Sequence, residues 1–194
     1  MSLDDLAKDG PIISNRDKYI GVYIGILAVV LAICSMGGGN AAKDATLKNI
    51  EASNTWAFFQ AKNARRQALN LQADDLELRL TSEVNLSEDA KKTISDRVAD
   101  YRAQAKKLTT DAERKEGLDE LWQKGKALEI DRDHALKRDP YFDYGEALLQ
   151  IAIVLASVAI ISGVNFLLFV SIALGSLGML ATIGGFTLAF PLPF

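Results

Sequence analysis

The sequence has one cysteine, Cys34, and one histidine, His134, among its 194 residues. A single thiol excludes an intrachain disulfide. A lone histidine surrounded by charged residues cannot build the usual zinc sites or a hydrolase triad. The sequence also lacks a glycine-rich phosphate loop, an HExxH pattern and a nucleophile elbow. We therefore expect a protein that is not an enzyme and that holds no cofactor and no metal ion.

Charged side chains are absent from three long segments. These segments are residues 19–36, 147–162 and 166–190. A helix rises ~1.5 Å per residue, so each segment is long enough, or nearly so, to cross a hydrocarbon core of ~30 Å. The sequence therefore predicts an all-α integral membrane protein with three transmembrane helices, preceded by a tail over residues 1–18.

The first apolar segment has an alternative interpretation. Arg16 and Lys18 precede it, and Leu31 to Cys34 weakly resembles a lipoprotein cleavage box, so it could be a secretory signal. Such boxes need a small residue before the cysteine, whereas this chain has Ile33. A retained membrane helix is the favoured interpretation.

The second and third apolar segments are separated by only a short polar break, Ser162 to Asn165. Gly163 suits the left-handed conformation that ends a helix, and Asn165 is a candidate N-cap for the next one. Two helices joined by a tight turn also satisfy the backbone at membrane depth. We expect Pro191 and Pro193 to end the last helix.

Small residues recur in each apolar segment at alternating steps of four and three. A seam of small side chains lets helix backbones approach closely in a bilayer, where close packing drives association. Candidate assembly residues are therefore Gly21 and Gly25 in the first segment and Gly175 and Gly178 in the third. The three seams are Gly21, Gly25, Ala28, Ala32 and Ser35; Ala152, Ala156, Ala159 and Gly163; and Ser171, Gly175, Gly178, Thr182 and Gly185.

Residues 37–146 carry most of the charge and predict a helical hairpin inserted between the first two membrane helices. Gly37 to Gly39 is an expected hinge, followed by a helix from Ala41 to about Leu80. Ser87 is the expected N-cap of a second, antiparallel helix, and Pro140 should kink or end it. The expected buried faces have near-heptad spacing, typical of a coiled coil. They are Ile50, Ala57, Ala61, Ala64, Ala68 and Leu71, paired with Ile94, Val98, Tyr101, Ala105, Leu108 and Ala112, then Leu118, Leu121, Gly125 and Leu128.

The hairpin buries little apolar area because its expected core face is rich in alanine. At ~25 cal/mol per Å², such a seam hardly offsets the entropy of ordering a long chain segment. We therefore expect a homo-oligomer. Lys and Arg number 22 against 25 Asp and Glu, so no basic excess indicates a nucleic-acid partner. The bilayer and another membrane protein are the other expected partners.

The most distinctive run in the chain is Glu51 to Lys62, EASNTWAFFQAK. It resembles the signature of the DUF4337 family of uncharacterised bacterial membrane proteins, and the run from Gly145 to Ile161 is similar to the start of that family's second membrane helix. The resemblance implies this architecture but names no reaction. Relatives commonly carry arginines in the membrane hairpin turn, which this chain lacks.

The aromatic residues of this run, with the polar residues beside them, form a candidate partner-binding site. Three interpretations are open: a packed contact between helices, a binding platform for a ligand or partner, and an anchor at the membrane interface. The last is disfavoured because Trp56 lies too far along the helix from the membrane end. The candidates are Trp56, Phe58, Phe59, Gln60 and Lys62.

Two polar residues, Glu146 and Gln150, lie one turn apart where the second membrane helix begins. Polar groups at membrane depth are costly unless paired, so both are functional candidates; the alternative places Glu146 at the interface near a helix N-terminus. Tyr141, Phe142 and Tyr144 suit an aromatic belt.

The leading hypothesis is a scaffold or accessory protein in the bacterial inner membrane. The family's basic hairpin turn implies that the N-terminus and this turn are cytoplasmic and that the helical domain is periplasmic. A channel or transport subunit is the alternative, although the apolar segments offer few polar side chains to line a pore.

Overall fold

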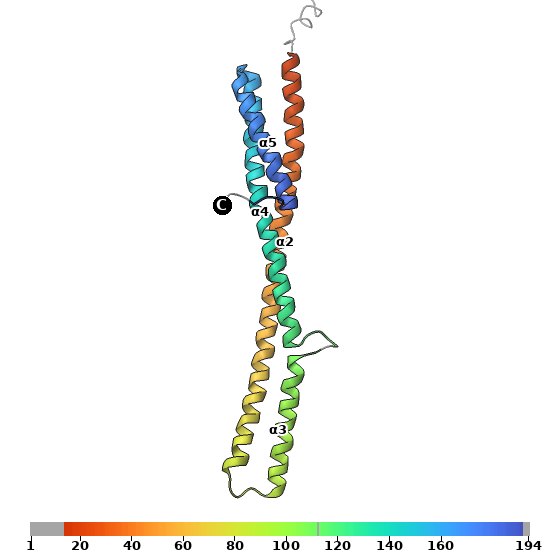
Figure 1. Ribbon diagram of the computed structural model, residues 1–194, viewed down its shortest axis with the longest axis vertical. Helices are drawn as coiled ribbons and strands as arrows, with labels where there is room; N and C mark the ends of the chain where they lie inside the picture. The colour runs from red at the N-terminus through yellow and green to blue at the C-terminus, as the bar shows by residue number, and fades with distance from the viewer. Residues whose placement is uncertain (1–13, 112, 192–194) are drawn as a thin grey trace, which may run out of the picture. The chain divides into compact units, whose positions relative to one another are not determined.

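The computed structural model describes residues 14–111 and 113–191, and all the regular secondary structure in these residues is α-helix (Figure 1). The helices are α2 (Asn15–Ser82), α3 (Glu88–Thr109), α4 (Leu118–Ser162) and α5 (Asn165–Thr187). No strand occurs among the described residues. The predicted all-α class is therefore confirmed.

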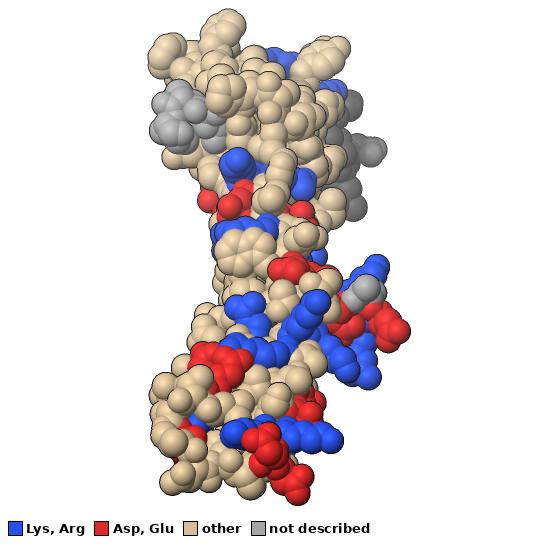
Figure 2. Space-filling view, turned by 60° about the horizontal axis from the view of Figure 1, so that its bottom comes forward, with Lys and Arg blue, Asp and Glu red and all other residues tan. Residues whose placement is uncertain are grey.

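Three of these helices, α2, α4 and α5, are long and apolar enough to cross a membrane. The chain divides into two compact units. We call the described residues of 1–44 and 134–194 the apolar unit and residues 45–133 the charged unit. Acidic and basic side chains are interspersed over much of the surface, while large areas carry neither (Figure 2).

The core of the apolar unit follows a seven-residue repeat along α2. Ile20, Leu27, Cys34 and Ala41 are at most 3% exposed. The core cluster also contains Phe142, Leu149 and Ala152 from α4. A strict seven-residue repeat keeps one narrow face of a helix turned toward its neighbours. This spacing therefore selects which face of α2 the bundle buries.

The predicted glycine hinge is wrong, since Gly37 to Gly39 lie inside α2. The helix continues there because Phe142 fills the space that the missing side chains leave. A Cβ at Gly37 would lie 2.5 Å from Cε1 of Phe142, and one at Gly38 would lie 3.1 Å from its Cβ. The glycines admit a bulky ring instead of breaking the helix. Phe142, at 1% exposed, is therefore a core residue rather than part of an aromatic belt.

Two of the three predicted small-residue seams pack inside the apolar unit. Ala152, Ala156 and Ala159 of α4 are fully buried. Every member of the α5 seam is buried as well. The seam of α2 differs, because Gly21 and Gly25 are exposed and a Cβ at either would meet nothing within 4 Å. Among the residues that the structure describes, none packs against Gly21 or Gly25 of the α2 seam.

The turn between α4 and α5 forms where the sequence predicts it. Gly163 follows the end of α4 with a φ of 71°, as expected for the left-handed region. The predicted cap at Asn165 is wrong, because Val164 occupies the N-cap and makes no side-chain cap bond. Helix α5 ends at Thr187 with left-handed Leu188 (φ 51°), before Pro191. Pro193 lies outside the described residues.

In the charged unit the predicted second helix is interrupted. Ser87 is the N-cap of α3, as predicted, and accepts a hydrogen bond from the Ala90 amide at 3.2 Å. The helix then stops at Thr109, and α4 begins only at Leu118. Between them Asp111 accepts a 3.0 Å bond from the Arg114 amide, a local side-chain bond that competes with helix.

Pro140 was predicted to kink or end the helix; it lies inside α4, so of these two alternatives the end of the helix is wrong. Tyr141 and Phe142, the next two residues, are both buried. Proline removes one backbone hydrogen bond from a helix, at a cost of ~3 kcal/mol. Burial of two large aromatic side chains directly after it offsets a penalty of that size.

The predicted buried face of α2 in the charged unit is also wrong. Ile50 and Leu71 are 51% and 68% exposed, and the four alanines between them are exposed as well. The buried positions are instead Ala45, Ala52, Thr55 and Ala73. Alanines lie on both faces of this helix, so their spacing alone does not select one.

Candidate partner-binding site

The run of aromatic residues in α2 contributes to a cluster with α4. Trp56 lies edge-on to Phe59 at a centroid distance of 5.7 Å and to Trp122 at 5.1 Å. Gly125 makes room for the indole, since a Cβ there would lie 2.8 Å from Cε2 of Trp56. Edge-to-face rings of this kind stabilise a contact beyond their buried area. The cluster therefore fixes the register of α2 against α4.

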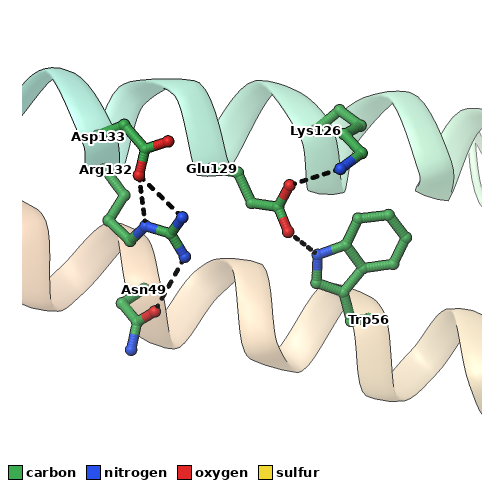
Figure 3. Close-up of polar contacts among 6 residues, drawn as sticks. All are labelled: Asn49, Trp56, Lys126, Glu129, Arg132 and Asp133. Atoms are coloured by element: carbon green, nitrogen blue, oxygen red, sulfur yellow. Dashed lines mark hydrogen bonds and ion pairs between the residues drawn. The ribbon is translucent and has the colours of Figure 1, made fainter.

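A polar network extends from the same indole (Figure 3). Trp56 Nε1 donates to Glu129 at 3.0 Å, and Lys126 Nζ lies 2.8 Å from the other carboxylate oxygen. The Lys126 ammonium also lies 5.7 Å from the ring centroid of Trp56 and 5.6 Å from that of Trp122. The hydrogen bond from Lys126, and then that from Trp56, lower the pKa of Glu129 below its usual range.

The network gives α4 a pH-dependent contact with α2. The pKa of Glu129 is lower in the folded protein than its ordinary value of 4.5. The ionised carboxylate therefore stabilises the folded protein at pH values above 4.5. This stabilisation is lost as the pH falls through the folded pKa. We expect Glu129→Gln to reduce thermal stability at pH 7, and we expect the difference from the parent to become smaller at pH 3. Thermal melts of both proteins at the two pH values test this, and an equal difference at both values would contradict it.

A second polar bridge between α2 and α4 involves Arg132. Its guanidinium donates to Asp133 at 2.8 Å and to the Asn49 side chain at 3.4 Å (Figure 3). The sequence did not single out Arg132, Glu129 or Trp122. Trp122 alone carried a signal, as the second of the two tryptophans in the chain.

The remaining candidates from the same run lie elsewhere. Phe58 is 45% exposed, and Lys62 Nζ lies 5.1 Å from its ring centroid. Lys62 also donates a hydrogen bond to the Glu116 carbonyl, in the segment that links α3 and α4. Gln60 is exposed. The run thus supplies two surfaces, one packed against α4 and one open.

In the apolar unit, Gly175 and Gly178 lie at close crossings between helices. A Cβ at Gly175 would lie 2.7 Å from Tyr23 Oη, and one at Gly178 would lie 2.8 Å from Leu149 Cγ. The hydroxyl of Tyr23 donates to the Ser171 carbonyl at 3.0 Å, which links α2 to α5. These glycines join helices within one chain, unlike Gly21 and Gly25.

The polar pair at the start of the second charge-free segment, in α4, forms its own hydrogen bond. Gln150 Nε2 donates to Glu146 at 3.1 Å, and the Gln150 side chain is exposed. Arg138, a residue that the sequence did not indicate, donates to the Gly185 carbonyl at 2.9 Å. Its guanidinium lies 5.9 Å from the centroid of the Phe142 ring. Burial, and then the nearby Asp143, raise the pKa of Asp139.

His134 is exposed, in agreement with its expected position on a solvated face. The sequence also predicted that it lies among charged side chains, and Asp133 beside it is bound by Arg132.

These observations define a class: an all-helical protein with three helices of membrane-spanning length and a separate charged helical unit. The family model described as "Domain of unknown function (DUF4337)" matches residues 16–188. The chain belongs to this family, as its resemblance to the family signature predicted. No curated protein and no solved structure matches the chain.

Proposed function

We propose that the protein is a non-enzymatic integral membrane protein that assembles into a homo-oligomer and scaffolds a partner or the bilayer. In this proposal the apolar segments of α2, α4 and α5 span the membrane. The charged unit is a coiled-coil-like helical hairpin outside it. The N-terminus and the α4–α5 turn are cytoplasmic, and the charged unit is periplasmic in a bacterial inner membrane.

One observation carries the proposal: α2 presents an apolar heptad stripe that the described residues of its own chain leave exposed. The stripe is Ile50, Ala57, Ala64, Leu71 and Leu78, and all five are exposed. Apolar residues at every seventh position are the pattern by which helices of separate chains pair. Single exposed apolar residues are common on protein surfaces. A seven-residue repeat of them over residues 50 to 78 of one helix, a span of 29 residues, instead favours a second helix as the partner.

The exposed seam of α2 in the apolar unit supports the same conclusion independently. Gly21, Gly25, Ala28, Ala32 and Ser35 are all exposed, although the α5 seam is buried and the α4 seam is buried at its three alanines and exposed only at Gly163. Leucine and a lipid tail are equally apolar, so a helix gains little by burying large residues in a bilayer. Close backbone approach through small residues does stabilise helix pairs there. A second copy offers an identical seam.

The membrane helices support a scaffold more than a pore. Hydroxyl groups of Ser157, Ser176 and Thr187 donate to carbonyls of their own helices at 2.8 to 2.9 Å. The Gln150 amide donates to Glu146. Such groups have their partners already and offer little to a hydrated ion path.

Native mass spectrometry of the protein in mild detergent tests the proposal. We expect a discrete oligomer, and we expect Gly21→Leu with Gly25→Leu, or Ile50→Lys with Leu71→Lys, to shift it toward the monomer. Loss of two apolar contacts of this kind should weaken association at least tenfold. Retained circular dichroism would show that the helices still form.

Matched controls use exposed residues off the two stripes. Val22→Leu with Val29→Leu, and Val84→Lys, should leave the oligomer unchanged, because these residues are 61 to 93% exposed and lie off both seams. A monomeric parent protein would contradict the proposal. So would a robust ion leak through liposomes that Gln150→Leu abolishes, since that result would favour a channel.

A further inference from the structure

The open surface beside Phe58 forms a groove in the charged unit. It lies between α2, α3 and the segment that links α3 to α4, and its volume is about 500 Å³. Phe58 and Ala61 of α2 and Leu108 of α3 supply its apolar lining. A volume of this size is typical of sites for small molecules, which occupy roughly 300 to 1,000 Å³.

The groove is surrounded by basic side chains that the fold leaves unpaired. Arg65 of α2, Lys107 of α3 and Arg114 of the linking segment line it together with Lys62. Among the described residues, no carboxylate forms an ion pair with Arg65, Lys107 or Arg114. Two other cations of this unit do have carboxylate partners: Arg102 lies between Asp74 and Glu77, and Arg79 binds Asp75.

The acidic residues of the groove do not neutralise it. Its lining contains only two of them, Asp111 and Glu116. Asp111 accepts its hydrogen bond from the backbone amide of Arg114, so this carboxylate holds the turn of the linking segment. Lys62 donates to the carbonyl of Glu116 rather than to its carboxylate. Cationic charge therefore exceeds anionic charge around an apolar floor.

We propose that this groove binds a small amphipathic anion, a carboxylate or phosphate joined to an apolar or aromatic group. The anionic group would lie between the side chains of Arg65 and Lys107, which come from facing helices and also line a smaller adjoining hollow of about 160 Å³. Charge-assisted hydrogen bonds from such cations are the strong ones in proteins. The apolar group would pack on Phe58 and Leu108.

A second groove in the same unit provides an internal comparison. It has a nearly equal volume, about 490 Å³, and is lined by Arg79, Arg97 and Tyr101 among others. There Asp75 lines the groove as well and pairs with Arg79 at 3.1 Å. The two grooves thus have nearly the same volume, but the groove beside Phe58 has the larger excess of basic over acidic residues in its lining. Arg97→Ala is accordingly a matched control for the loss of one cation.

Isothermal titration of the full-length protein in zwitterionic nanodiscs tests the site with phenyl phosphate, inorganic phosphate and phenol. We expect phenyl phosphate to bind more tightly than either fragment. Arg65→Ala and Lys107→Ala should each weaken it about tenfold, whereas Arg97→Ala should change it less than twofold. Phe58→Ala should weaken phenyl phosphate and leave inorganic phosphate unchanged. Added salt should weaken binding.

The result is independent of self-assembly, because all lining residues come from one chain and the titration can be repeated with a monomeric variant. Failure of phenyl phosphate to bind at millimolar concentration would overturn the inference. So would equal loss of binding in Arg97→Ala. Binding of the protein only to vesicles with anionic lipid, or only to an acidic peptide, would assign the basic surface to a membrane or a protein and would also overturn it.

Discussion

Replacing Gly178 by leucine should destabilise the apolar unit by about 3 kcal/mol, near the upper end of the usual cost of overpacking a core. At this position α5 lies against α4 with no space for a side chain. A Cβ would lie 2.8 Å from Leu149 Cγ and 3.1 Å from the carbonyl oxygen of Gly145. The side chain of Leu149 can change rotamer. The Gly145 carbonyl belongs to the backbone of α4 and cannot move unless α4 and α5 separate.

Gly145, the residue of α4 at this crossing, also has no space for a side chain. A Cβ at Gly145 would lie 2.9 Å from Cys34 Sγ and 3.3 Å from the Gly178 carbonyl oxygen. Three helices thus meet where two glycines face each other. Gly178→Ala should therefore cost less than Gly178→Leu but still be measurable, in contrast to the usual gain when alanine replaces glycine in a helix.

Denaturant titration in mild detergent, followed by circular dichroism, measures this effect. Gly39→Leu is the matched control, because Gly39 also lies inside a helix of the apolar unit and a Cβ there would meet nothing within 4 Å. The control should be as stable as the parent or more so. Equal stability of the Gly178 and Gly39 variants would show that the α4–α5 crossing is not close-packed.

Trp56→Ala should destabilise the charged unit by about 3 kcal/mol, the lower end of the range for removing an aromatic side chain from a core. The substitution removes ring contacts with Phe59 and Trp122. It also leaves an empty space over Gly125 and takes one donor from Glu129. Trp56→Phe keeps most of the ring packing and should cost only about 1 kcal/mol, the net value of one hydrogen bond.

Hydrogen exchange of the full-length protein localises the effect. Faster exchange in Trp56→Ala should be confined to α2 and α4 in the charged unit, since local stability follows local contacts. Val84→Ala, at a residue 93% exposed between α2 and α3, should leave exchange unchanged. Uniform acceleration across the apolar unit as well would contradict a local role for the cluster.

The candidate site was only partly predictable. The aromatic run in α2 stood out in the sequence, and its Trp56 and Phe59 do pack against another helix. Its partners Trp122 and Glu129 come from more than sixty residues later, with no local pattern to connect them. Of the cations that line the proposed anion site, the sequence singled out Lys62 but not Arg65, Lys107 or Arg114. Arg65 and Lys107 look like ordinary solvated helix residues until α3 is placed beside α2.

Several features are determined by local sequence. The absence of charge marks the segments long and apolar enough to cross a membrane. Gly163 ends α4 because glycine adopts a positive φ at little cost, and Ser87 begins α3 because its hydroxyl satisfies a free amide. Each of these depends on a residue and its near neighbours along the chain.

Other features depend on which surfaces meet, and only the tertiary structure decides them. Gly37 to Gly39 read as a hinge, yet they are helical, and Phe142 of α4 occupies the space beside Gly37 and Gly38. Alanine lies on both faces of α2, and Trp122 of α4 packs against Trp56 and Phe59 on one side of this helix. Glycine and alanine carry little packing information of their own. Their role is set by the large side chain that arrives from a distant part of the chain, and no spacing within α2 specifies that partner.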